Sequence, residues 1–274
     1  MEHLLLLAVL ICAIANFFAL VYGFYRMRRM LRGALSGVRE ELSDVFTQAT
    51  QKQFSQLEAL AGLMVELAFK KSLPATRGWA ASPDFLREVA LHVLQSHPKV
   101  IVECDSGVST VVLARCMQMN GSGHVFSLDH SSEYAEKTRR ELERHHLKDW
   151  ATVLTAPLRP YKLNGEIWPW YSIDELPQIG FDMMVIDGPP WFASTLARYP
   201  TGPLLFHRLN ASAAVFLDDA DRQQEQTTLR RWAEEFLEFR QEMRNCEKGC
   251  GVLWKDTEMP HDVNAAQCRQ TSEV

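Results

Sequence analysis

Acidic residues stand at the points where four separate apolar segments end. The segments are rich in Val, Ile, Leu, Met and Phe, as buried parallel strands are, and the acids that close them are Glu103, Asp129, Asp187 and the pair Asp218 and Asp219. In an open α/β sheet the carboxyl ends of the strands lie along one edge, where ligands bind. One such acid is as easily a turn residue as a functional one, but four in corresponding places predict a site.

The first of these segments, residues 99–110, predicts a strand that passes into a helix through a tight turn. Val100 to Val102 precede Glu103, the turn follows at Ser106 and Gly107, and the apolar run then resumes after Thr110. Exposed backbone amides at a helix start, next to an acidic strand end, suit a nucleoside-type cofactor. This stretch is the expected centre of the fold.

The remaining pattern predicts alternating strands and helices around this first strand. After an opening helix over 84–95, we expect helices over 110–118, 132–145, 203–209 and 222–236, and strands over 123–129, 151–154, 181–187, 213–219, 239–244 and 251–255. The last two strands read as an antiparallel pair. Residues 157–180 are expected to form a loop, whose Trp168, Trp170 and Tyr171 either line or cover an acceptor pocket or pack the loop onto the sheet.

The N-terminal stretch is hydrophobic enough to be a membrane anchor. Leu4 to Tyr22 is almost wholly apolar, has about the roughly 20 residues that span a bilayer, and is followed by four arginines between positions 26 and 32. A cleaved signal peptide has its positive charges before the apolar stretch, so that alternative fits less well. The basic flank predicts that residues 1–33 anchor a chain whose remainder is cytoplasmic. A buried or partner-packed helix is the other possibility.

Residues 34–72 have the spacing of an amphipathic helix. Apolar residues recur at steps of three and four among Glu, Gln and Lys, although the pattern weakens at residues 51–53. We interpret this segment as a stalk that self-associates into a homo-oligomer, or equally as a solvated helix lying on the globular domain. That domain is expected over 73–255, with a polar tail over 256–274.

Composition narrows the functional classes. The chain has 274 residues, is 47% hydrophobic and carries a formal net charge of −5, which gives no support for nucleic-acid binding. The six cysteines show no paired zinc spacing; Cys246 and Cys250 lack nearby partner ligands, so reduced thiols of a cytosolic domain are expected.

The ordered set of motifs resembles class I S-adenosylmethionine-dependent methyltransferases, and within them the small-molecule O-methyltransferases that act on catechols and macrolide sugars. The motifs are residues 102–110, Leu128-Asp129, Phe181 to Pro190 and Phe216 to Asp219, and the similarity spans roughly residues 80–255. It implies a Rossmann-like, seven-stranded, mostly parallel sheet with a terminal antiparallel hairpin, here preceded by a transmembrane helix and a helical stalk.

The resemblance also implies roles for individual residues. Glu103 and the loop containing Asp105, Gly107 and Ser109 would face the methionine and sugar of S-adenosylmethionine, Asp129 would hold the ribose hydroxyls, and His130 would lie near the adenine. In metal-using members of the family the positions of Asp187, Asp218 and Asp219 hold a divalent cation such as Mg²⁺, which activates a substrate hydroxyl. Asp187 is thereby the expected catalytic position.

Two departures from the family pattern keep an alternative open. Asp105 stands where the family usually has glycine, and no His or Lys base follows Asp187, where Pro189, Pro190 and Trp191 stand instead. His207 and Arg198 are interpreted as structural. The main hypothesis is O-methylation of a small-molecule, sugar or lipid-linked acceptor at the cytoplasmic membrane face. The alternatives are an inactive methyltransferase-fold scaffold or regulator, and a nicotinamide-dependent oxidoreductase, against which the missing three-glycine fingerprint argues.

Overall fold

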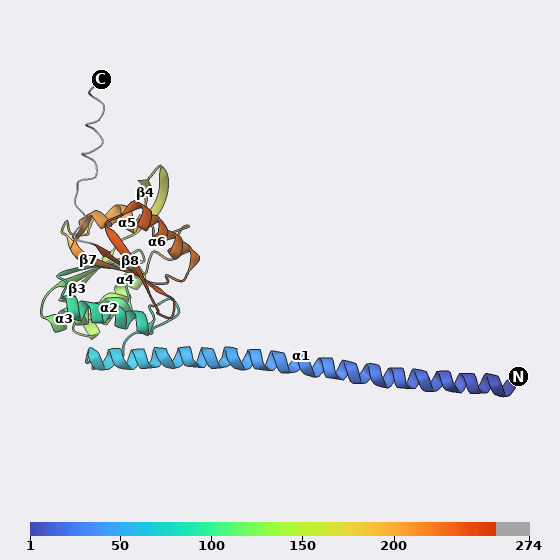
Figure 1. Ribbon diagram of the computed structural model, residues 1–274. Helices are drawn as coiled ribbons and strands as arrows, with labels where there is room; N and C mark the ends of the chain where they lie inside the picture. Colours follow the sequence, from blue (N-terminus) through green and yellow to red (C-terminus); the bar gives the residue numbers. More distant parts are fainter. Residues whose placement is uncertain (256–274) are drawn as a thin grey trace, which may run out of the picture. The chain divides into compact units, whose positions relative to one another are not determined.

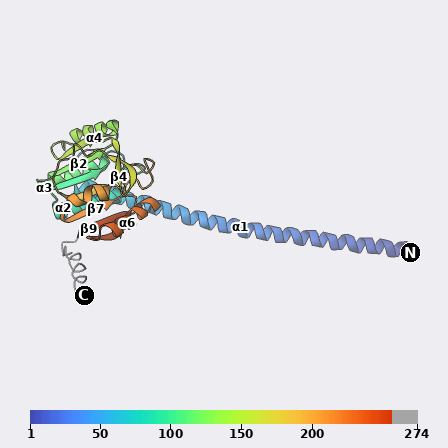
Figure 2. The same cartoon turned by 90° about the horizontal axis from the view of Figure 1, so that it is seen from above.

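The computed structural model describes residues 1–255, so the predicted polar tail lies outside the described residues. The chain divides into two compact units, residues 1–55 and the part from Gln56 onward. Helix α1, Glu2–Glu66, supplies all of the first unit and begins the second (Figure 1, Figure 2).

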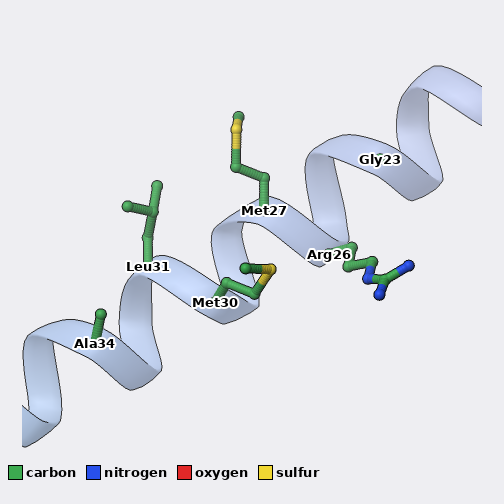
Figure 3. Close-up of a pocket in the computed structure, with 6 residues that line it drawn as sticks. All are labelled: Gly23, Arg26, Met27, Met30, Leu31 and Ala34. Carbon is green, nitrogen blue, oxygen red and sulfur yellow. The ribbon is translucent and has the colours of Figure 1, made fainter.

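The first unit is helical from residue 2 onward, and every residue in it is exposed. By length and composition alone, α1 can cross a membrane. Met27, Leu31 and Ala34 line one side of a shallow groove at the basic flank, and Arg26 projects away from them (Figure 3).

The end of α1 packs within the second unit. The Gln56 side-chain amide donates to the Asp84 carboxylate at 2.7 Å, and Arg87 pairs with Glu66. Leu63 of α1 is fully buried in a core that it shares with α2, Pro83–Ser96. From residue 56 the helix therefore lies on the globular domain, which was one of the two expectations for the stalk.

The second unit is built on the predicted seven-stranded sheet. Its order is β3-β2-β1-β6-β7-β9-β8, in which the first five strands are parallel and β9 runs antiparallel to both neighbours. The strands are β1 Val100–Cys104, β2 His124–Asp129, β3 Ala151–Thr155, β6 Phe181–Ile186, β7 Leu209–Leu217, β8 Phe239–Arg244 and β9 Cys250–Lys255. Strands β2 and β3 follow β1 on one side, and β6 and β7 lie on its other side, so the strand order reverses between β1 and β6. The crevice expected for a ligand lies at the carboxyl ends of these two strands.

Side chains alternate between two cores, one on each face of the sheet. Met183 and Val185 of β6 enter the core that contains α2, α3 (Val108–Asn120) and α4 (Ser132–Arg144). Met184 and Ile186 enter the other core, with α5 (Thr201–Leu205), the short helix η1 (Phe206–Arg208) and α6 (Gln223–Glu235). Burial on both faces explains why these strands read as continuous apolar runs.

The expected loop over 157–180 is wrong in part, because most of it forms a two-stranded antiparallel hairpin. Strands β4, Leu158–Leu163, and β5, Glu166–Tyr171, are joined by Asn164 and Gly165, which both have positive φ. Asn-Gly is the preferred pair for such a turn, so this sequence signal was available. Likewise, the helix expected over 203–209 is only α5 followed by the 3₁₀ turn η1.

Candidate active site

Four aspartates form a row across the carboxyl ends of neighbouring strands. Leu128, Cys104, Ile186 and Leu217 occupy one register level of β2, β1, β6 and β7. The residues that follow them are Asp129, Asp105, Asp187 and Asp218. The sheet thus brings together the predicted strand-end acids, with Asp105 rather than Glu103 as the member contributed after β1.

Asp105 has the backbone conformation for which glycine is favoured. Its φ is +90°, a region that side chains with a Cβ rarely adopt, and this is where the family pattern has glycine. Burial, together with the charges of Asp187 and Asp129, raises the pKa of Asp105 to about 8. Near neutral pH the side chain is therefore largely protonated, which limits its repulsion of a carboxylate ligand.

The predicted loop leads directly into α3. The Gly107 amide donates to the Thr110 hydroxyl at 3.0 Å, and Ser109 is buried in the first turn. A Cβ at Gly107 would meet nothing within 4 Å, so the backbone faces open space at this point. A ligand can approach the loop backbone there.

Glu103 lies inside the protein behind this loop. One carboxylate oxygen accepts hydrogen bonds from the hydroxyls of Ser127 at 2.5 Å and Thr110 at 2.6 Å. Burial raises the pKa of Glu103 to about 7, although these hydroxyls oppose the shift. The other oxygen, Oε1, has no partner among the described residues.

Asp129 is fully buried and held by its own neighbours. Its Oδ2 accepts from the Ser106 hydroxyl at 2.5 Å, and its Oδ1 accepts from the Ser131 amide at 2.8 Å. His130 Nδ1 lies 4.0 Å from the same Oδ1. That ring nitrogen lacks a hydrogen-bond partner within residues 1–255. The two residues predicted to contact ribose and adenine are thus adjacent.

Tyr171 is one of the three aromatic residues expected either to line or cover an acceptor pocket or to pack the loop onto the sheet, and it is fully buried. The end of β5 brings its ring within 6.3 Å of the His130 ring, and its buried hydroxyl has no partner in the described part of the chain. A Cβ at Gly188 would lie 2.2 Å from that hydroxyl and 2.9 Å from the Asp105 Cβ. Gly188 therefore allows the end of β6 to approach both residues. Trp168 and Trp170 are buried in the core, which agrees with the interpretation that these aromatic residues pack the segment onto the sheet.

The three carboxylates predicted to bind metal do come together, with one oxygen from each within 4.8 Å of the others. A buried arginine lies among them. Arg198 donates to Asp219 Oδ2 at 2.7 Å, to Asp187 Oδ1 at 3.2 Å and to the Asp218 carbonyl oxygen at 2.7 Å. Its side chain is only 3% exposed, whereas that of Asp187 is 13% exposed.

More cations surround this acidic cluster. Arg222 lies 2.8 Å and Lys248 3.6 Å from the Asp219 carboxylate. A further carboxylate, that of Glu225, lies 3.7 Å from Arg198. Burial would lower the pKa of Arg198, but the neighbouring carboxylates raise it above its ordinary value, so it is always charged. Burial raises the pKa of Asp218 to about 8, and the charges of Asp187 and Asp219 act in the same direction. Because the Arg198 guanidinium already donates to two of the three carboxylates, the residues present do not fit a divalent cation.

Arg198 had no recognisable sequence pattern, because it lies in an irregular segment between β6 and α5. The only available signal was the excess of carboxylates at the strand ends, which require compensation when buried. His207, the other residue interpreted as structural, is exposed on η1.

Comparisons with known proteins agree with this fold. Residues 102–220 match a family model described as a methyltransferase domain. An O-methyltransferase from Bacillus cereus, crystallised with S-adenosylhomocysteine, superposes with a TM-score of 0.51 at 17% identity, covering 73% of this chain and 91% of that one. A Podospora anserina methyltransferase, also bound to S-adenosylhomocysteine, gives 0.51 at 12% identity, covering 72% and 88%. No curated protein matches the sequence.

Proposed function

We propose, because residues 102–220 match a family model described as a methyltransferase domain, that this protein transfers a methyl group from S-adenosylmethionine to an oxygen of its acceptor. The observation that supports this most is the row of aspartates at the carboxyl ends of β2, β1, β6 and β7, beside the open backbone at Gly107. This is the edge at which the fold binds ligands.

The cofactor proposal is supported by unsatisfied polar atoms. Glu103 Oε1, His130 Nδ1 and the Tyr171 hydroxyl are all buried without partners among the described residues. Buried polar atoms without partners cost free energy, so a ligand with amino, hydroxyl and ring nitrogen groups is favoured beside them. Asp129 would bind the ribose, and the loop from Asp105 to Ser109 the methionine part.

Asp187 is the proposed general base. One of its oxygens accepts from Arg198, it is more accessible than the other carboxylates of the cluster, and burial raises its pKa from the ordinary range. When bound, S-adenosylmethionine supplies an electrophilic methyl group on sulfonium. Asp187 would take the proton of the acceptor hydroxyl as its oxygen is methylated, with S-adenosylhomocysteine as the leaving product.

A hollow of about 380 Å³ beside the cluster is the proposed acceptor entrance. It is lined by Trp191 and by Arg222 to Glu225 at the start of α6, and Arg222 pairs directly with Asp219. An aromatic face next to amide and charged groups suits a hydroxylated acceptor.

A lipid-linked acceptor is supported by the apolar N-terminal helix and by exposed aromatic residues near the same hollow. Trp191 and Trp79 both pack edge-to-face against Phe192, and all three are exposed. Such side chains favour the membrane interface. We propose that residues 1–33 anchor the protein and that the domain works at the cytoplasmic face on a small-molecule, sugar or lipid-linked hydroxyl.

Calorimetry on the full chain in nanodiscs tests the cofactor. We expect S-adenosylhomocysteine to bind with micromolar affinity, and Asp129→Asn to weaken it at least about tenfold through loss of charge-assisted hydrogen bonds. Asp44→Asn, an equivalent change on exposed α1, is the matched control and should bind normally. Absence of binding at millimolar concentration would contradict the proposal and favour an inactive scaffold.

Methyl-labelled S-adenosylmethionine tests the acceptor. Incubation of the protein with lipid and aqueous cell extracts should label a hydroxyl-bearing compound, and mass spectrometry of molecules that co-purify should identify it. Label on nitrogen or carbon would contradict O-methylation while leaving the cofactor proposal intact.

A further inference from the structure

The acidic cluster at the ends of β6 and β7 already contains a cation. The Arg198 guanidinium contacts the carboxylates of Asp187 and Asp219 and the backbone carbonyl oxygen of Asp218. A divalent ion bridging Asp187 and Asp219 would have to share their oxygens with a guanidinium 2.7 to 3.2 Å away. An ion bound to the same carboxylates would lie close to the guanidinium, and like charges that are close together repel, most of all in a buried site.

The ion pairs of the cluster are also matched in number. Asp187, Asp219 and Glu225 are the three paired carboxylates. Their cationic partners are Arg198, Arg222 and Lys248, which are also three. Two partners, Arg222 and Lys248, come from different segments and both contact Asp219. Asp218 is a fourth carboxylate of the cluster; it forms no ion pair with the described residues, and its Oδ1 accepts from the Asp219 amide. Each of the other three carboxylates already has a cationic partner within the protein.

We propose that Arg198 is the resident cation of this cluster, in the place where a metal-using enzyme would hold a divalent ion. It donates one hydrogen bond to Asp187 Oδ1 and one to Asp219 Oδ2, so it holds the Asp187 carboxylate through one oxygen and leaves Asp187 Oδ2 for the acceptor. Arg198 is thus a positioning residue for Asp187, and no divalent ion binds at Asp187, Asp218 and Asp219. The role of Asp187 in this inference rests on the proposed function, but the exclusion of metal does not.

Titration with Mn²⁺ alone tests the exclusion. The full chain in phosphatidylcholine nanodiscs is titrated while free Mn²⁺ is followed by electron paramagnetic resonance, with empty discs as background. We expect no saturable site below millimolar Mn²⁺ in the natural protein. Arg198→Met keeps much of the side-chain length but removes the charge, and we expect it to gain one site per chain, at least about tenfold tighter than any in the natural protein.

Control variants separate this effect from general changes of charge. Arg230→Met removes an exposed arginine from the same region and should gain no site. Arg198→Lys keeps the charge and should also gain none. In Arg198→Met combined with Asp219→Asn the new site should be lost again.

Several results would overturn the inference. A saturable Mn²⁺ site in the natural protein that Asp219→Asn abolishes would show that a metal binds beside Arg198. A folded Arg198→Met variant without a new site would show that the arginine is not what excludes the ion. If Arg198→Met does not fold, by circular dichroism, the natural protein and Arg198→Lys decide, since a site in either one contradicts the inference. Calorimetry with S-adenosylhomocysteine on the same samples tests the proposed function separately.

Discussion

The chemistry of individual residues at this site is set by how deeply the sheet buries them. Asp105, Glu103 and Asp218 are all acids whose pKa burial raises, to about 8, about 7 and about 8 respectively. Each therefore binds a proton more tightly in the folded chain than in the unfolded one. Such groups contribute stability that is present at low pH and is lost as pH rises from the unfolded pKa through the folded pKa.

Thermal unfolding as a function of pH tests these shifts. In the absence of ligand, we expect the stability of the globular unit to fall between about pH 5 and pH 8, with each proton bound contributing a slope of up to about 1.4 kcal/mol per pH unit. Asp105→Asn tolerates the positive φ and cannot ionise, so its slope should be shallower. The control Asp44→Asn should keep the slope of the natural protein. Equal slopes for all three would show that Asp105 is not protonated in the folded state.

Asp187→Asn tests the proposed base. The amide preserves shape and can still accept from Arg198 but cannot take a proton, so methyl transfer to the labelled acceptor should fall by about 10²- to 10⁴-fold. Affinity for S-adenosylhomocysteine should stay within a few-fold of normal. A rate near that of the natural protein would assign proton removal to another group or to water.

At the scale of elements, two segments carry features beyond the common fold. The hairpin β4-β5 brings Tyr171 to the strand ends, and α1 presents exposed apolar residues for much of its length. Leu31, Leu35, Val38, Leu42 and Val45 are exposed and follow alternating steps of four and three, the spacing of a coiled-coil seam. The seam ends before Gln56, which is buried against Asp84 in the same chain.

Self-association through this seam is a testable prediction. Leu42→Glu puts a charge into the seam and should shift the full chain in detergent toward monomer, by sedimentation or mass photometry. Thr47→Glu adds the same charge on a different side of the helix and should leave the oligomer intact. A monomeric natural protein, or equal effects of the two substitutions, would contradict the seam.

At the scale of the whole molecule, the anchor and the α/β unit are expected to act independently. Removal of residues 2–33 deletes the apolar stretch and its arginines but leaves the packed part of the chain from Gln56 onward. We expect this variant to move from the membrane to the soluble fraction and to bind S-adenosylhomocysteine as the full chain does. Retention in the membrane after a carbonate wash would show that other surfaces hold the protein there.

The sequence alone determined the arrangement of the sheet. Strands buried on both faces must be continuous apolar runs, and parallel strands must end at one edge, so the gathering of Asp129, Asp187, Asp218 and Asp219 followed from local patterns. The seven-stranded, mostly parallel sheet followed from the resemblance to methyltransferases. The glycine-like position of Asp105 was also visible in the sequence, and its φ of +90° agrees with it. The β4-β5 hairpin was predictable from Asn164 and Gly165.

Only the tertiary structure decided what surrounds those acids. Arg198 reaches the site from a segment without periodicity or motif, because its position depends on how the chain returns after β6 over the sheet edge. Tyr171 ends a hairpin that the sequence does indicate, but its approach to the strand ends depends on how that hairpin packs. Register decided that Asp105, and not Glu103, joins the row of aspartates. A pattern of carboxylates is the same whether a metal ion or a guanidinium neutralises it, and the choice depends on long-range packing that spacing along the chain does not encode.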